Sequence, residues 1–229
     1  MNEIHHRVKN NFEIISSLLD MSSMQTENKE NQNLWGDARA RIHSMALIHE
    51  QLYQSDRFDQ IDMERHVQNM LDYLSHIYAE SGRRITSVIE PSEVYLSVSQ
   101  SIPCALVLNE LISNAFKHAF REKKQGTVRV SISTPDPTTV HIKVIDDGDG
   151  IAEGTDIYRQ TGLGLKMVRH LVSGQLKGQM RVKNDSGTEI SIRFKRSNDG
   201  EKHEKIMAVE DEALICDRTA PQNKFKRRT

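Results

Sequence analysis

Apolar residues recur at helical spacing through the first quarter of the chain. A first row has steps of four, four, three and four positions, which places its members on one side of a helix: Ile4, Val8, Phe12, Ile15 and Leu19. A second row follows the polar, aperiodic stretch 22–33: Leu34, Ala38, Ile42, Met45, Ile48 and Leu52. Two amphipathic helices joined by a polar link predict an antiparallel hairpin.

Each helix of this hairpin has a single apolar side, and a lone hairpin would leave much of that side in water. Pairing two hairpins into a four-helix bundle buries it. The pattern therefore predicts a homodimer.

From about Phe58 onward, helical rows alternate with short β-like runs. We expect helices at Val67–Ile77, Ile102–Phe120 and Leu163–Leu176, and strands at Ile85–Ile89, Val94–Val98, Val128–Thr134, Val140–Ile145, Gln179–Lys183 and Glu189–Phe194. This order indicates a two-layer α/β sandwich. The predicted class is α+β, with a hairpin domain at 1–57, a sandwich domain at 58–197, and a polar linker and tail at 198–229.

Composition narrows the function classes. The 229 residues contain 31 Lys plus Arg against 32 Asp plus Glu, a formal net charge of -1, which argues against a nucleic-acid-coating role. Cys104 and Cys216 lie far apart without a Cys/His cluster, which disfavours a disulfide scaffold or a structural zinc site. No apolar run approaches the roughly 20 residues of a membrane span, and no signal peptide opens the chain. We expect a cytoplasmic protein without a membrane segment.

The second half of the predicted sandwich domain contains two glycine pairs. Asp146-Asp147-Gly148-Asp149-Gly150 follows a β-like run, and Gly162-Leu163-Gly164-Leu165 opens a helix. Glycines let backbone amides approach a ligand closely, and a helix N-terminus favours phosphate. Each pair alone is also compatible with a tight turn.

A third element lies upstream, on the helix predicted at 102–120. Glu110, Asn114, Lys117 and His118 are spaced i, i+4, i+7 and i+8, so they share one face. An amide oxygen and an ammonium on one face can meet Mg²⁺ and a phosphate chain together. The alternative interpretations are a surface position for Lys117, a turn cap for Asp146 and an ordinary strand residue for Thr188.

These three blocks resemble the nucleotide-binding boxes of the ATPase superfamily of gyrase, the ninety-kilodalton heat-shock chaperones, mismatch-repair ATPases and histidine kinases. The resemblance implies that Asp146 accepts a hydrogen bond from the adenine amino group, that Asn114 holds Mg²⁺ and that Lys117 touches phosphate. It further implies an ATP site to which these residues contribute: His118, Gly148, Gly150, Gly162, Leu163, Gly164, Leu165 and Thr188.

The first helix carries a candidate phosphoacceptor. At about 100° per residue, His6 lies about 160° from the centre of the apolar row and His5 about 60° from it. The His6 ring should therefore face solvent, and an imidazole with a pKa of about 6.5 is mostly neutral at pH 7 and free to attack phosphorus.

The segment from Glu3 to Phe12 resembles the phosphoacceptor box of sensor histidine kinases whose motif reads His-Arg-Val-Lys-Asn. The resemblance implies that His6 accepts phosphate and that Asn10 tunes phosphotransfer and dephosphorylation. Many histidine kinases have an acid directly after the acceptor, whereas Arg7 stands here. The general base stays open between Glu110 and Glu3.

The segment Lys205–Ile215 resembles the first strand and acidic pair of a response-regulator receiver domain. Too few residues follow it to complete such a domain, so we expect a truncated, disordered stub.

Together these features predict a histidine protein kinase that uses ATP and Mg²⁺ to phosphorylate His6 and passes the phosphoryl group to a response-regulator aspartate. Two alternatives stay open: an ATPase or conformational clamp in which Glu110 activates water, and a dimerisation scaffold with a vestigial ATP site.

Overall fold

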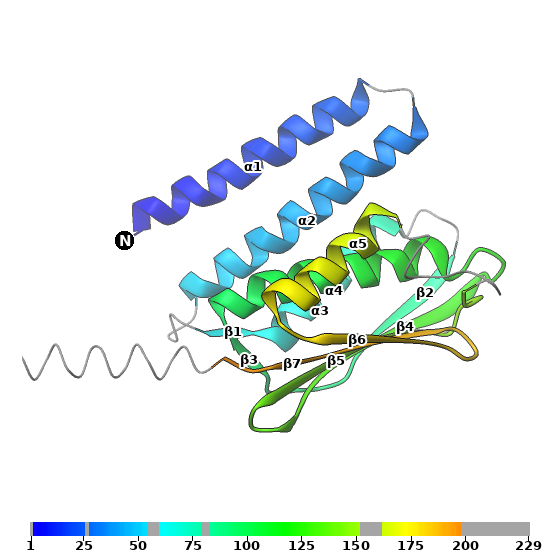
Figure 1. Ribbon diagram of the computed structural model, residues 1–229. Helices are drawn as coiled ribbons and strands as arrows, with labels where there is room; N and C mark the ends of the chain where they lie inside the picture. Colours follow the sequence, from blue (N-terminus) through cyan, green and yellow to red (C-terminus); the bar gives the residue numbers. More distant parts are fainter. Residues whose placement is uncertain (1, 26–27, 55–59, 79–82, 152–161, 198–229) are drawn as a thin grey trace, which may run out of the picture. The chain divides into compact units, whose positions relative to one another are not determined.

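The computed structural model of the chain describes residues 2–25, 28–54, 60–78, 83–151 and 162–197. Its helices are α1 Asn2–Met24, α2 Lys29–Gln54, α3 Met63–Tyr78, α4 Val98–His118 and α5 Leu163–His170. Its strands are β1 Gln60–Asp62, β2 Arg84–Ile89, β3 Tyr95–Ser97, β4 Gln125–Asp136, β5 Thr139–Asp146, β6 Gln179–Asn184 and β7 Thr188–Lys195. The predicted mixture of a helical N-terminal region and a sheet-containing domain is confirmed (Figure 1).

The helical hairpin has longer arms and a shorter link than predicted. Helix α1 ends at Met24 and helix α2 begins at Lys29, so most of the stretch 22–33 is helical. The link is shorter than the polar stretch 22–33 because apolar periodicity marks only the packed length of a helix. Ser17 and Ser22 donate their hydroxyls to the carbonyls four residues earlier, which keeps these polar residues within the helix.

Five strands form the main sheet in the order β2-β4-β5-β7-β6. The pair β2–β4 is parallel and the other pairs are antiparallel, as expected of a largely antiparallel set. Strand β1, which the sequence did not predict, pairs with β3 in a separate two-stranded sheet.

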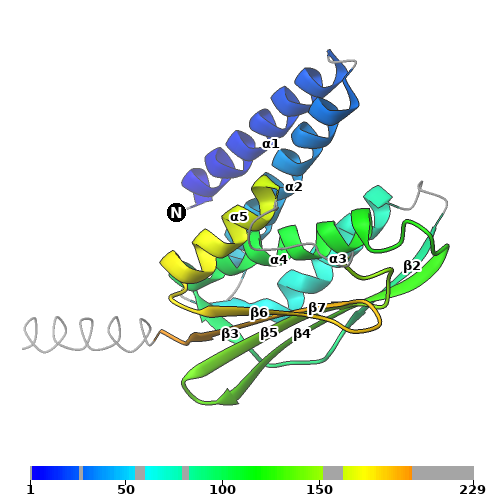
Figure 2. The same cartoon turned by 45° about the vertical axis from the view of Figure 1, so that its right-hand side comes forward.

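Helices α3, α4 and α5 lie on one side of the main sheet (Figures 1 and 2). The side chains that alternate inward along β4 and β5 are buried beneath them, together with the apolar side of α4: Val128, Val130, Ile132, Val140, Ile142, Val144, Leu108, Leu111 and Ile112. This layer arrangement explains why α4 is buried over most of its length.

Two helices of the sheet-containing domain have other boundaries than predicted. Helix α4 begins at Val98, four residues before the predicted start, although Pro103 lies inside it. Proline has no backbone N–H, so one hydrogen bond is missing from this part of the helix. In the same segment, the Ser101 hydroxyl donates to the carbonyls of Leu96 and Ser97. The predicted helix 163–176 ends in a π-helical turn at Leu171–Gln175.

Candidate nucleotide site

The proposed adenine end of the site lies where β5 stops. Asp146, the last residue of β5, is 7% exposed, and its Oδ1 accepts N–H bonds from Gly148 (3.0 Å) and Thr188 (3.2 Å). Thr188 stands opposite Asp146 in the β5–β7 register. Burial raises the pKa of Asp146, and the bonds from Gly148 and Thr188 partly oppose that shift.

Glycines allow the backbone to fold tightly around this carboxylate. A Cβ at Gly148 would collide with the carbonyl oxygen of Ala119, and Gly150 has a φ of +73°, a conformation that favours glycine. Asn184 fixes the loop by accepting from the Ile151 amide and donating to its carbonyl, both at 2.7 Å. The sequence analysis missed Asn184 because a polar residue at a strand end carries no distinctive pattern.

The four residues predicted to share a face of α4 become more exposed toward the C-terminal end of the helix. Glu110 is buried, Asn114 and Lys117 are half-buried, and His118 is exposed. Partial burial and the charges of Arg121 and Lys117 lower the pKa of His118. A neutral His118 at pH 7 leaves Lys117 and Arg121 as the cations at this end of the helix.

Two ion pairs connect this face of α4 to helix α2. Arg41 Nε donates to Glu110 Oε1 at 2.5 Å, with side-chain exposures of 22% and 7%. One turn earlier on α2, Asp37 pairs with the Lys117 ammonium. The bond to Glu110 is the main cause that raises the pKa of Arg41. Sequence reasoning missed Arg41 and Asp37, since nothing in the sequence says which face of α4 the hairpin contacts.

The start of α5 also approaches Glu110. A Cβ at Gly164 would collide with Glu110 Oε2 and would lie 3.9 Å from Arg41 Nη2, whereas Gly162 has open space around it. Leu163 is 68% exposed, and Leu165 packs against the core. The structure therefore brings Gly164, the α4 face and α2 together around one carboxylate.

The predicted phosphoacceptor lies on α1. His6 falls within this helix, but its side chain, like those of His5 and Glu3, lies outside the described residues. Asn10, one turn further, is exposed and borders a shallow groove on α1. Residues 152–161, between the two glycine pairs, and the receiver-like segment 205–215 also lie outside the described residues.

The site suits Mg²⁺ only if water and the nucleotide phosphates supply most of the metal's ligands. The described part of the chain contains no group of three or more His, Cys, Asp or Glu residues placed to hold a metal ion. Mg²⁺ usually takes one or two protein ligands and completes its shell with water and substrate phosphates. The half-buried amide of Asn114 suits that mode, because it lies on the same helix face as Lys117.

Two family models match parts of this chain. Residues 3–78 match the family model described as histidine kinase, and residues 99–198 match the one described as histidine kinase-, DNA gyrase B- and HSP90-like ATPase. The second match implies that this domain binds ATP. Among the described residues, no helix is long and apolar enough to cross a membrane.

Two related histidine kinases align with most of the chain. The sensor histidine kinase PdtaS of Mycobacterium tuberculosis is 30% identical over 195 residues, which are 83% of this chain and 38% of the relative. A blue-light-activated histidine kinase of Erythrobacter litoralis is 25% identical over 197 residues, 83% of this chain and 55% of that protein.

A solved structure shows the same fold. The histidine kinase domain of a blue-light-activated kinase from Erythrobacter litoralis superposes with a TM-score of 0.64 at 25% identity, covering 84% of this chain and 89% of that domain. The chain spans less than half the length of PdtaS. With a helical region of the histidine kinase type followed by an ATPase domain of the gyrase and HSP90 class, the chain belongs to the histidine kinase family.

Proposed function

We propose that this chain is the catalytic core of a two-component histidine kinase, which transfers the γ-phosphoryl group of ATP to His6 and then to an aspartate of a response-regulator receiver domain. The observation that carries the proposal is the presence of both family matches in one chain. The direct contact of α2 with Glu110 and Lys117 supports it, because the hairpin that bears His6 then reaches the nucleotide-binding face.

Each residue of the candidate nucleotide site has a proposed role in binding ATP. Asp146 would accept from the adenine amino group, and Lys117 would neutralise phosphate charge. Asn114 would hold Mg²⁺, which supplies further neutralisation of the phosphate chain when bound. Glycines 148, 150, 162 and 164 would allow close backbone approach. The boundary at 57/58 between the hairpin and ATP-binding domains stays part of this proposal.

The proposed reaction transfers the phosphoryl group in two steps. A ring nitrogen of His6 bonds to the γ-phosphorus while the bond from phosphorus to the β,γ-bridging oxygen breaks, and ADP leaves. The imidazole proton passes to a base, for which Glu110 and Glu3 are the candidates. In the second step the phosphoryl group moves to a receiver carboxylate oxygen, and the free imidazole is restored.

The test is phosphorylation of the purified chain with ATP labelled on the γ-phosphate. The expected product is an acid-labile, base-stable phosphoprotein that disappears in His6→Gln and persists in the matched control His5→Gln. Label retained in His6→Gln would refute the acceptor assignment. Steady phosphate release without a labelled protein would support the ATPase clamp instead, a reading that the match of residues 3–78 does not favour.

We also propose that the core is a homodimer through its hairpin. Besides the predicted apolar row, α1 exposes a second row that the sequence analysis missed, in which Ile14, Leu18 and Met21 are 58%, 53% and 52% exposed. These three side chains line the shallow groove beside Asn10. Burying them would remove apolar area from water.

Sedimentation velocity tests the proposed dimer. It should give twice the chain mass for the parent chain and one chain mass for Leu18→Glu. A monomeric parent chain would contradict the dimer.

A further inference from the structure

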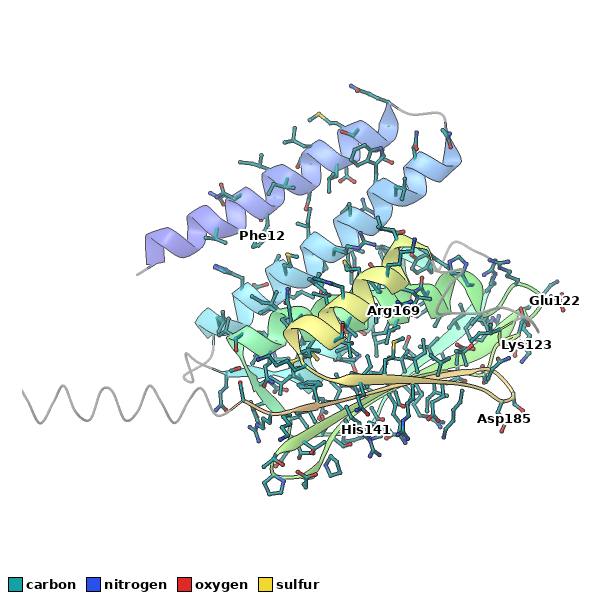
Figure 3. All side chains as sticks on the ribbon, viewed as in Figure 1. Phe12, Glu122, Lys123, His141, Arg169 and Asp185 are labelled. Carbon is teal, nitrogen blue, oxygen red and sulfur yellow. The ribbon has the colours of Figure 1, made fainter. Side chains whose placement is uncertain are left out.

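The side of the main sheet that faces away from the helices carries an excess of positive charge. Alternation along β4, β5, β6 and β7 turns one set of side chains inward to the core and the other set outward. Six of the outward residues are basic: Arg129, Lys143, Arg181, Lys183, Arg193 and Lys195. We call these six residues the basic face. Figure 3 shows side chains, with His141 among them, projecting from this side of the sheet.

The strand register places these cations close together. Arg193 stands opposite His141 across β5–β7, and Lys143 lies two residues along from His141 on the same face. Arg181 pairs with Ser191, which in turn pairs with Lys143. Both Arg193 and Lys143 contribute to lowering the pKa of His141, after its partial burial, which is the largest cause.

Few acids offset this charge. Among the outward residues of these four strands, Glu189 and Asp136 are acidic. Glu189 pairs with Lys183 at 3.4 Å, and Asp136 accepts from the backbone and hydroxyl of Thr138 at the hairpin tip. The whole chain has a net charge of -1, so acidic residues elsewhere balance this local excess of positive charge.

The chemistry of this face selects among anionic partners. Its outward strand positions, all described, contain no Phe, Tyr or Trp. Single-stranded nucleic acids bind sheet faces largely by stacking bases on aromatic residues. Stable protein interfaces rely on buried aromatic and apolar anchors, and the only large aliphatic side chain among these positions is Ile145. Diffuse attraction to an anionic bilayer requires only accessible Lys and Arg side chains.

We propose that the basic face docks the ATP-binding domain on an anionic lipid surface. Sheet twist prevents all six cations from meeting a plane at once, so neighbours near the sheet centre, such as Arg129, Lys143 and Arg193, contribute most. Asp146 points to the opposite side of β5, into the core. Docking therefore leaves the nucleotide site accessible, and the proposal does not depend on the kinase assignment.

The test measures partition of the full chain onto vesicles of phosphatidylcholine containing about one third phosphatidylglycerol. Each basic residue near such a surface contributes about a fivefold factor, so Arg129→Gln/Arg193→Gln should weaken partition by about 25-fold. The matched control Lys166→Gln/Lys177→Gln removes the same charge from exposed positions on the helical side and should change partition less than about twofold. The basic stretch 217–229 is common to all variants and cancels in the comparison.

Raising the salt concentration from about 0.1 M to about 0.5 M should abolish the partition that the basic face supplies. Equal binding to pure phosphatidylcholine vesicles, or equal loss in both double variants, would overturn the proposal. So would a charge-dependent complex with a single-stranded oligonucleotide or an acidic peptide in the absence of vesicle binding. Thermal unfolding of the variants verifies that each is folded.

Discussion

The two ends of the candidate nucleotide site are built in different ways. At the proposed adenine end, the partners of Asp146 come from the loop after β5 and from β7, all within the sheet domain. At the proposed phosphate end, Glu110 and Lys117 of α4 bond to Arg41 and Asp37 of α2, which belongs to the helical hairpin. One end is self-contained, and the other shares its charges with a second part of the molecule.

This difference indicates where the hairpin can influence nucleotide binding. A change in the hairpin leaves the hydrogen bonds of Asp146 untouched, whereas it alters the partners of both charged residues at the phosphate end. Arg41 and Asp37 are one turn apart on α2, so a single displacement of this helix releases both ion pairs.

Arg41→Gln should lower the free energy of unfolding by about 2–3 kcal/mol, because it leaves the Glu110 carboxylate buried without its partner. Denaturant unfolding followed by circular dichroism measures this. The double variant Arg41→Gln/Glu110→Gln should regain most of the loss, since the uncompensated charge is gone. Simple additivity of the two single changes would show that the pair is not coupled.

Asp146→Asn should weaken nucleotide affinity by about 30-fold, equivalent to about 2 kcal/mol, through loss of a charge-assisted hydrogen bond to adenine. Burial already disfavours the ionised form of Asp146 and raises its pKa, so the neutral amide should change the unfolding free energy little. Titration calorimetry with ATP and with ADP checks the affinity. Unchanged affinity with an intact fold would remove Asp146 from the adenine site.

Asp37→Asn should strengthen ATP binding by about fivefold, because Lys117 no longer has to leave an ion pair of about 1 kcal/mol before it meets phosphate. Asp20→Asn is the matched control: it removes the ion pair between Asp20 of α1 and Arg39 of α2, which involves no residue of α4. The control should bind ATP as the parent does. A similar gain in both variants would point to general loosening of the hairpin rather than to release of Lys117.

Local pattern predicted most elements and missed those that depend on contacts made by distant residues. The strands of the main sheet follow the alternation of apolar residues, and their predicted positions agree with the structure to within a few residues. Strand β1 is only three residues long and forms by pairing with β3. Too short to show periodicity, it was not predicted. The second exposed row on α1 escaped notice because the first row already explained the helix.

The family, the order of the two family regions and the glycine-rich and α4 motifs can be identified from the amino-acid sequence alone, because each motif is short, contiguous and of fixed spacing. The pairing of Arg41 with Glu110 and of Asp37 with Lys117 follows only from the packing of α2 on α4. The arrangement of six basic residues on one side of the main sheet likewise follows only from strand pairing. Ion pairs and charged faces join residues from separate elements, and their positions follow from how those elements pack.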